Sequence, residues 1–141
     1  MLFSTHIAFA LFFWLLAFPG SLWMLAVAAF ASLLPDIDHP EAKLGRYMPL
    51  GFLFEHRGFF HGIAALAMMS GISLVFFPGY TAAVAIGYGS HILGDALSRK
   101  GIMPFHPFSR MRIRGFLRVG GLVEHLLAVA LVIADIYLLL F

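Results

Sequence analysis

Apolar residues form five long runs along this chain, separated by short polar segments or by Pro-Gly pairs. Each run is long enough, or nearly long enough, to cross a bilayer, which takes about 20 helical residues. Pro19-Gly20 and Pro78-Gly79 predict tight turns inside the first and second pairs of runs. The expected helical runs are Leu2–Phe18, Ser21–Leu34, Phe59–Phe77, Thr81–Leu97 and Gly121–Phe141.

This pattern predicts an all-α fold, a polytopic membrane helix bundle with about five transmembrane helices. Residues 1–141 are expected to form one integral-membrane domain, because no linker or repeat of solenoid length divides them. The second run is short, so we expect it to tilt little or to end inside a polar cavity. The first run lacks the basic residues that precede a signal peptide core, so we interpret it as a retained helix.

Composition agrees with a membrane protein. Of the 141 residues, 62% are hydrophobic and only 11% are charged, whereas a soluble domain of this length needs more polar surface. The absence of cysteine excludes disulfides, thiolate metal sites and a cysteine nucleophile. The basic residues are few and confined to two segments, which argues against a nucleic-acid partner.

The positions of the basic residues predict the orientation. Five spans bring two of the connections to the same side, and all nine Lys and Arg lie in or beside these two. The positive-inside rule makes that side cytoplasmic, with the N-terminus inside and the C-terminus outside. The segment 111–119 alternates basic and apolar residues, which fits a short hairpin, an amphipathic stretch on anionic headgroups, or a simple charge anchor. The nine residues are Lys43, Arg46, Arg57, Arg99, Lys100, Arg110, Arg112, Arg114 and Arg118.

Metal-binding residue types gather on that same side. A charged side chain at the bilayer centre costs about 2.5–3.5 kcal/mol, so such residues in spans need a physical reason. Here five segments each deliver His, Asp or Glu to the cytoplasmic ends of the runs, which predicts a metal site at the mouth of the bundle. The residues are His6, Asp36, Asp38, His39, His56, His61, His91, Asp95 and Glu124.

Local spacing favours the same site. His91 and Asp95 are four apart and share one helix face. Asp36 and Asp38 project to one side if their stretch is extended. His61 is expected to point inward from the first turn of its helix, and His56 would act from the preceding loop.

Imidazole and carboxylate donors without sulfur suit Zn²⁺, Mn²⁺ or Fe²⁺, and six or more of them allow two ions. Other ionisable residues have simpler interpretations. His106 and His125 are expected to make interfacial or interhelical hydrogen bonds, and Asp36 could be only a turn former. Asp135 lies about 16 Å along its helix from Glu124, too far to join the site. The predicted metal ligands are Asp36, Asp38, His61, His91, Asp95 and, less directly, His6.

Four motifs together resemble those of a known family. They are PDIDHP, the HRGFFH box, SHILGDALSRKGI followed by PFHPF, and GGLVEH after an arginine-rich stretch. As an ordered set between hydrophobic runs they resemble the YdjM-like family of inner-membrane metal-dependent hydrolases. The resemblance covers nearly the whole chain and implies an activity class without a substrate.

The expected function is therefore a metal-dependent hydrolase of the inner membrane that acts at the cytoplasmic face on a lipid-associated ester. A phosphoester is favoured because the planar Arg57 guanidinium matches phosphate, although Arg57 could be only a charge anchor. Glu124 could be a ligand, an orienting partner or the general base, and His56 a further catalytic residue. The alternatives are an intramembrane amidase or protease, a metal transporter, and a protein in which the ion only stabilises structure.

Overall fold

The computed structural model describes residues 1–19, 21–38 and 58–141. Over these ranges the chain is helical with no strand, which confirms the all-α prediction. The fourth predicted run matches its helix to the residue, and the first, third and fifth differ only at their ends. The helices are α1 (Phe3–Ala17), α2 (Trp23–Ala31), α3 (Ile63–Phe76), α4 (Thr81–Leu97) and α5 (Leu122–Leu140), with short 3-10 helices η1 (Leu34–Asp38), η4 (Phe59–His61) and η5 (Pro78–Tyr80).

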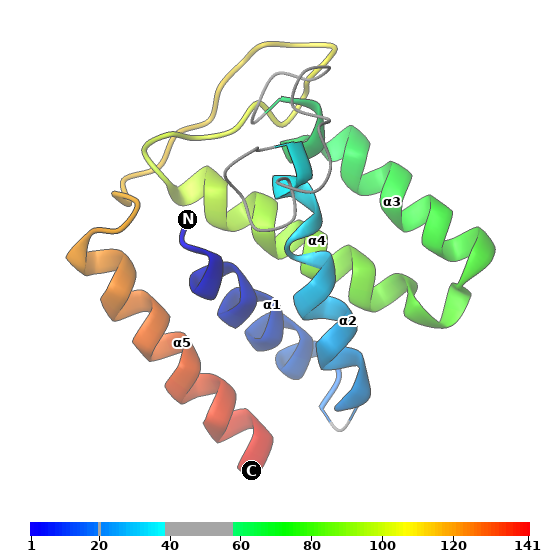
Figure 1. Ribbon diagram of the computed structural model, residues 1–141, viewed down its shortest axis with the longest axis vertical. Helices are drawn as coiled ribbons and strands as arrows, with labels where there is room; N and C mark the ends of the chain where they lie inside the picture. The colour runs from blue at the N-terminus through cyan, green and yellow to red at the C-terminus, as the bar shows by residue number, and fades with distance from the viewer. Residues whose placement is uncertain (20, 39–57) are drawn as a thin grey trace.

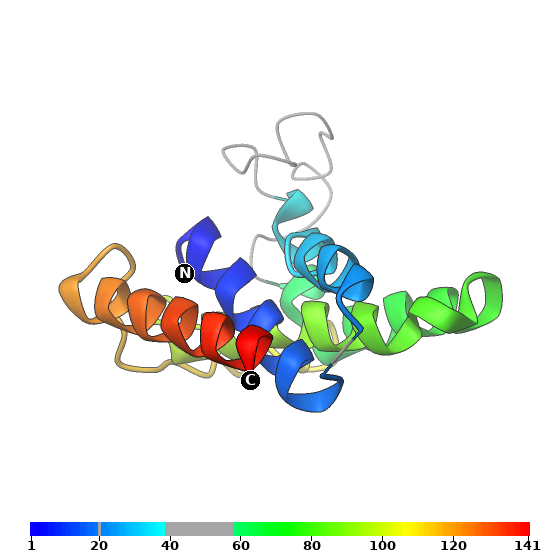
Figure 2. The same cartoon turned by 90° about the horizontal axis from the view of Figure 1, so that it is seen from below.

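Helix α4 is the centre of the bundle. It packs against α1, α2 and α3, while α5 packs mainly against α1 (Figure 1). Seen from below, α5 and α3 lie on opposite sides, with the other helices between them (Figure 2). Because three helices cover α4, its side chains are the ones best placed to meet residues from several parts of the chain.

A glycine allows α2 to approach α4 closely. A Cβ added at Gly87 would lie 2.2 Å from the carbonyl oxygen of Ala28, far inside van der Waals contact. Small residues of this kind let membrane helices pack backbone to backbone. Gly87 therefore sets the distance between α2 and α4, and through it the position of the chain that follows α2.

Helix length separates α5 from the rest. Among the described residues, only Leu122–Leu140 is both long and apolar enough to be a clear membrane span, with a mean hydropathy of 2.1 over its most apolar window. Phe3–Ala17 and Ile63–Phe76 are shorter apolar helices. The five helices of the prediction are present, and their number of membrane crossings stays a prediction.

The chain after α2 is not extended, so the condition under which Asp36 and Asp38 would project to the same side is not met. The backbone carbonyl of Ala28 accepts a bond from the Ser32 N–H, and a 3-10 helix then carries Pro35 and both aspartates. Side chains three apart eclipse in a 3-10 helix, so Asp36 and Asp38, two apart, point in different directions. Proline explains the break, because it disfavours α-helical geometry at Leu34 before it.

The segment between α4 and α5 is irregular and folds back on itself. Ile102 and Ile113 exchange two backbone hydrogen bonds, and Ser98 pairs with Leu117 in an isolated bridge. Gly101 turns the chain at a φ of +68°, where a Cβ would lie 2.2 Å from the Ile113 carbonyl oxygen. Residues 111–119 therefore form no hairpin of their own; Ile113 and Leu117 pair with Ile102 and Ser98 instead.

Candidate metal centre

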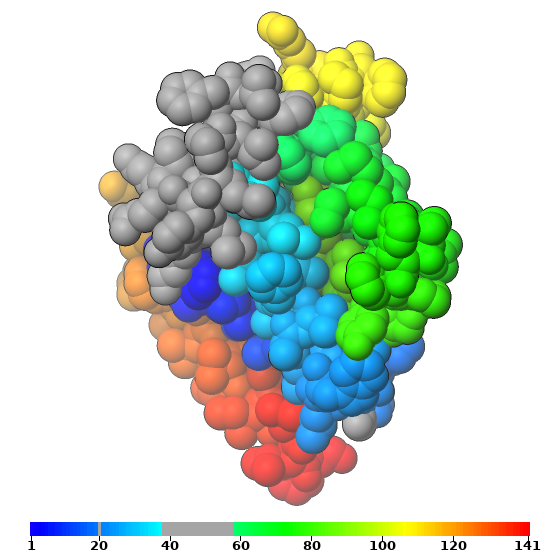
Figure 3. Space-filling view, turned by 45° about the vertical axis from the view of Figure 1, so that its right-hand side comes forward, coloured from blue at the N-terminus to red at the C-terminus, as the bar shows by residue number. Residues whose placement is uncertain are grey.

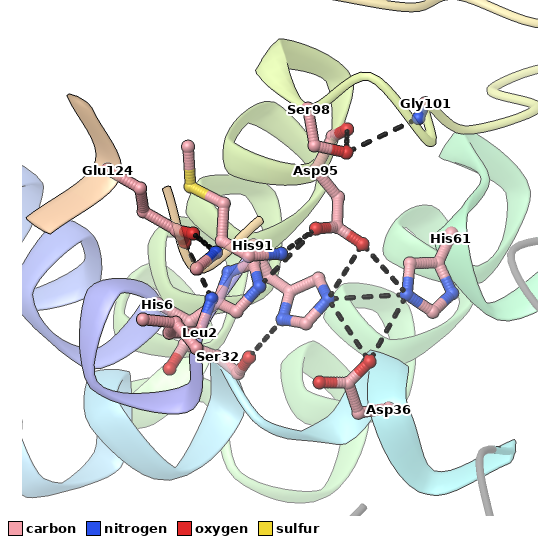
Figure 4. A network of polar contacts seen from close by, with 12 residues as sticks. Leu2, His6, Ser32, Asp36, His61, His91, Asp95, Ser98, Gly101 and Glu124 are labelled. Carbon is pink, nitrogen blue, oxygen red and sulfur yellow. Dashed lines mark hydrogen bonds and ion pairs between the residues drawn. The ribbon is translucent and has the colours of Figure 1, made fainter. Parts of the chain in front are cut away.

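Five of the six predicted metal ligands meet at one end of the bundle. They come from α1, η1, η4 and α4, and four of them are buried (Figure 4). The fifth, Asp36, has a side chain that is 29% exposed. The structure thus brings together His6, Asp36, His61, His91 and Asp95.

Four donor atoms form the compact centre of this group. His61 Nε2 lies 3.3 Å from His91 Nε2, 3.4 Å from Asp36 Oδ1 and 3.6 Å from Asp95 Oδ2. His91 Nε2 lies 3.7 Å from Asp36 Oδ1 and 3.9 Å from Asp95 Oδ2. We call His61, His91, Asp36 and Asp95 the four-donor cluster.

These distances match a known coordination geometry. Zinc–nitrogen and zinc–oxygen bonds of roughly 2.0–2.2 Å in a tetrahedron place neighbouring ligand atoms about 3.3–3.6 Å apart. The five separations in the cluster run from 3.3 to 3.9 Å. Two sets of three donors, His61, His91 and Asp95 in one and His6, Asp36 and His91 in the other, each lie within 4.8 Å of one another and could hold a small divalent ion. Their N and O chemistry suits Zn²⁺, Mn²⁺ or Fe²⁺.

The protonation of His91 can be read from its partner. His91 Nδ1 lies 2.6 Å from the backbone carbonyl oxygen of Ser32, and a carbonyl can only accept. His91 Nδ1 must therefore carry the proton, which leaves Nε2 in the neutral ring with its lone pair directed at the cluster. Metal-binding histidines commonly donate their other N–H to a carbonyl in this way, which fixes the tautomer and the ring.

His6 completes the group from the side of α1. Its ring stacks on His91 with centroids 3.7 Å apart, and its Nε2 lies 3.5 Å from Asp95 Oδ1. The amino group of Met1 also donates to this Asp95 oxygen. Asp95 thus faces the four-donor cluster with Oδ2 and His6 with Oδ1. The buried His6 Nδ1 has no hydrogen-bond partner among the described residues.

Asp36 occupies the outer edge of the cluster. Burial raises its pKa, but the hydrogen bond from His61 and the nearby His91 and His6 rings outweigh burial and hold the pKa well below its usual range. Asp36 is therefore ionised, as a metal ligand must be. Among the four donors that the structure describes, Asp36 is the one with appreciable exposure, and the other three are at most 1% exposed.

Four predicted site residues need separate comment. His61 ends η4 instead of lying in the first turn of α3, because Gly62 adopts an extended conformation between the two helices. Asp38 does not belong to the ligand groups that the described residues form. His56 and Arg57 lie outside the described residues, so their predicted catalytic roles stay predictions.

Glu124 is buried near the cluster but binds the backbone. Its Oε1 accepts from the Leu2 N–H and its Oε2 from the Gly120 N–H, each at 2.6 Å. Both oxygens are therefore engaged, and Glu124 joins the start of α1 to the start of α5. This geometry favours a positioning role over direct contact with an ion, and the general-base role stays a prediction.

Two contacts near the cluster were not foreseen. One is the Ser32 carbonyl, which sequence reasoning cannot identify because every residue carries a carbonyl. The other is Tyr88, whose hydroxyl donates to the Phe60 carbonyl oxygen at 2.6 Å and so joins α4 to η4 beside His61. A tyrosine in an apolar run three residues before His91 was the available signal.

Comparison with known proteins gives the family. The family model described as YdjM inner membrane protein matches residues 1–140. The uncharacterized protein YvsG of Bacillus subtilis (strain 168) is 31% identical over 122 residues, which cover 81% of this chain and 76% of that protein. The inner membrane protein YdjM of Escherichia coli (strain K12) is 31% identical over 135 residues, covering 84% of this chain and 68% of that protein.

The inner membrane protein YdjM of Shigella flexneri matches with the same identity and coverage as the Escherichia coli protein. No solved structure matches the chain. The family match covers almost every residue and includes all four motifs that the sequence suggested. This chain belongs to the YdjM family of inner membrane proteins.

Proposed function

We propose that this protein is a multi-pass inner-membrane hydrolase that uses a divalent metal ion at the cytoplasmic face. The observation that carries the proposal is the four-donor cluster, in which η1, η4 and α4 present two imidazoles and two carboxylates with separations of 3.3 to 3.9 Å. Its chemistry fits zinc best, with manganese or iron as alternatives. When bound, such an ion polarises the scissile group and acidifies a water molecule.

In this proposal some residues of the chain hold the metal ion, and another leaves room for water and substrate to reach it. His61, His91 and Asp95 are buried and would hold the ion from the closed side, with the Ser32 carbonyl fixing the His91 ring. Asp36 stands at the exposed edge, which leaves one direction from which water and substrate can approach. Catalytic zinc sites bind water beside three protein ligands and can expand to five-coordinate, so the proposal requires Asp36 to share or give up the fourth position when water binds.

We propose a lipid-associated phosphoester as the substrate. Six exposed Lys and Arg residues lie on the chain between Ser98 and Gly120, at the same end of the bundle as the cluster (Figure 1). Cationic side chains at a membrane surface attract anionic headgroups, worth about 1 kcal/mol each. Arg57 remains the candidate for a two-pronged phosphate contact, because lysine keeps the charge but lacks the planar fork.

The proposal includes the orientation in the membrane. Five crossings with the basic segments inside put the N-terminus in the cytoplasm and the C-terminus outside. Reporter fusions after Ser109 should read cytoplasmic, and fusions after Gly79 and Phe141 external. The opposite pattern would place the cluster on the outer face and defeat the cytoplasmic proposal.

Purified protein in lipid nanodiscs tests the activity. We expect about one divalent ion per chain and metal-dependent release of phosphate or headgroup from a phospholipid, with chelator abolishing turnover and zinc restoring it. Asp95→Asn should remove most of the ion and the turnover together. Full turnover in metal-free protein would refute the proposal, and release of an amine or a fatty acid instead would favour the amidase or carboxyl-ester alternative.

Glu124→Gln separates positioning from proton transfer. Glutamine would turn its NH₂ group toward one of the two backbone donors, so we expect destabilisation of about 1–3 kcal/mol. If Glu124 only positions the chain, the pH profile of turnover should keep its shape. A lost titration limb at unchanged metal content would instead make Glu124 the base.

A structural ion is the second candidate, because three of the four donors are almost fully buried. In that case chelation should lower the unfolding temperature strongly, and no lipid ester should be cleaved. An enzyme should show turnover whatever the change in unfolding temperature.

A further inference from the structure

A groove runs along the bundle from the four-donor cluster toward the opposite end. It lies between α2 and α3 with α4 as its floor, and its volume is about 460 Å³. Figure 3 shows this face, with α2 in blue to cyan and α3 in green. We call it the α2–α3 groove. Its lining residues are Val27, Phe30, Ala31, Leu34, Met69, Ile72, Ser73, Phe77, Tyr80 and Val84.

The groove is lined almost entirely by apolar groups. Ser73 and Tyr80 are the polar exceptions, and the Ser73 hydroxyl is turned to the Phe77 carbonyl oxygen of its own helix at 3.4 Å. Phe77 and Tyr80 lie at the end away from the cluster, where Tyr80 also packs edge-on against Trp23. The groove therefore offers few polar groups, the Tyr80 hydroxyl at its far end among them, and ends against aromatic rings.

The other end of the groove adjoins the cluster. Ala31 precedes Ser32, whose carbonyl binds His91, and Leu34 is two residues from Asp36. On the floor, Val84 lies seven residues before His91, two helical turns or about 10 Å along the same face of α4. An apolar chain in this groove would thus bring the polar group attached to it to the open, Asp36 side of the cluster.

The dimensions of the α2–α3 groove indicate what kind of molecule can bind in it. The lining residues from Met69 on α3 to Phe77 just after it are eight residue steps apart, about 12 Å, so 460 Å³ gives a mean cross-section of about 40 Å². A helix with its side chains is about 10–12 Å across and needs at least twice that area. A single hydrocarbon chain matches this cross-section better than a whole helix from a second copy does.

We infer that the α2–α3 groove binds one acyl chain of a membrane lipid and thereby places the headgroup linkage of that lipid at the four-donor cluster. This inference rests on the proposed function, in which the four-donor cluster is a hydrolytic metal centre. It adds the part of the substrate that the protein recognises. The enzyme would recognise a membrane lipid by its hydrocarbon chain, and the aromatic end of the groove would limit the depth that the chain reaches.

A second hollow supplies a matched control. It has about the same volume, 480 Å³, and is also apolar, but it lies between α1 and the opposite face of α4. Ile72 on the groove and Leu93 on this second hollow are 46% and 45% exposed. Tryptophan at either position adds the same bulk to a lipid-facing site, and only Ile72→Trp obstructs the groove.

Photolabelling tests the inference without needing turnover. The protein is placed in nanodiscs of phosphatidylethanolamine and phosphatidylglycerol containing a phosphatidylglycerol with a diazirine on one acyl chain. We expect labels on residues 27–34 and 69–80 several-fold above those on the second hollow. Ile72→Trp should reduce them at least fivefold and Leu93→Trp should not. Equal labelling of both hollows, or labelling insensitive to Ile72→Trp, would overturn the inference.

Kinetics separate the inference from the proposed function. Ile72→Trp should raise KM several-fold for a long-chain phospholipid and leave KM unchanged for a short, water-soluble phosphoester. An equal change in KM for both substrates would overturn the inference that the groove binds an acyl chain. If no ester is cleaved while the labelling pattern is as expected, the hydrolase proposal fails, but the binding of an acyl chain in the α2–α3 groove is still supported. Ile72→Trp dissociating a dimer in detergent would overturn the acyl-chain occupant in favour of a second copy.

Discussion

The two faces of α4 have the same helix geometry and very different surroundings. One face carries Gly87, His91 and Asp95 and is buried beneath α1, α2 and η1. The other carries Ala85, Gly89 and Leu93 and lines an open apolar hollow. The difference shows that ionisable residues in this apolar helix lie only where other segments supply donors and acceptors for them, as the cost of burying charge requires.

The largest difference between the faces should appear in metal binding. His91→Ala removes a ligand, and we expect the affinity for zinc to fall more than about 100-fold, because loss of an outer-shell partner alone typically costs 10–100-fold. Leu93→Ala on the other face should leave the affinity unchanged. Competition with a chromophoric chelator measures both, and an unchanged affinity in His91→Ala would remove α4 from the site.

Alanine substitutions of glycines on the two faces of α4 should change the stability of the protein in opposite directions. The Cβ of Gly87→Ala would meet the Ala28 carbonyl oxygen at 2.2 Å, so α2 must move, and we expect a loss of about 3 kcal/mol. Gly89→Ala meets its nearest neighbour at 3.9 Å and should gain up to about 1 kcal/mol from helix propensity. Unfolding in mixed micelles measures both changes. Similar stability of the two variants would mean that the close contact between α2 and α4 is not needed.

The smallest expected effect concerns the hydroxyl groups of α4. Tyr88→Phe loses the bond to the Phe60 carbonyl, and we expect about 1 kcal/mol of destabilisation with a roughly tenfold weaker metal affinity, because this bond positions the turn that carries His61. Ser90→Ala loses only a bond within α4, to the Gly87 carbonyl, and should leave metal affinity unchanged. If both variants bind metal like the parent, Tyr88 does not position the cluster.

Much of the fold was predictable because hydrophobic length and helix breakers decide it locally. The run Thr81–Leu97 is bounded by the Pro78-Gly79 turn and by polar residues, and α4 has those limits. The run after Ser21 was predicted to continue to Leu34, but its α-helix ends at Ala31 and the backbone tightens into η1 around Pro35. Sequence reasoning noticed the proline there and misjudged the geometry it imposes.

The site was predictable to the extent that it depends on spacing. His91 and Asp95 share a face because they are four apart, and both point into the cluster as expected. Glu124 was harder, because its partners are the backbone N–H groups of Leu2 and Gly120. Contacts to the backbone of a distant segment leave no trace in residue types, so only the folded chain distinguishes this carboxylate from a ligand.

The lengths of the helices have a consequence for the surrounding membrane. Helices α1, α3 and α4, with 15, 14 and 17 residues, span about 21–26 Å, against a hydrocarbon thickness of about 30 Å. In the proposed topology the bilayer must thin around this bundle, at a fraction of a kcal/mol for each ångström of mismatch. Thinning lowers the headgroup layer toward the cluster, and it should concentrate the protein wherever the membrane is already thin.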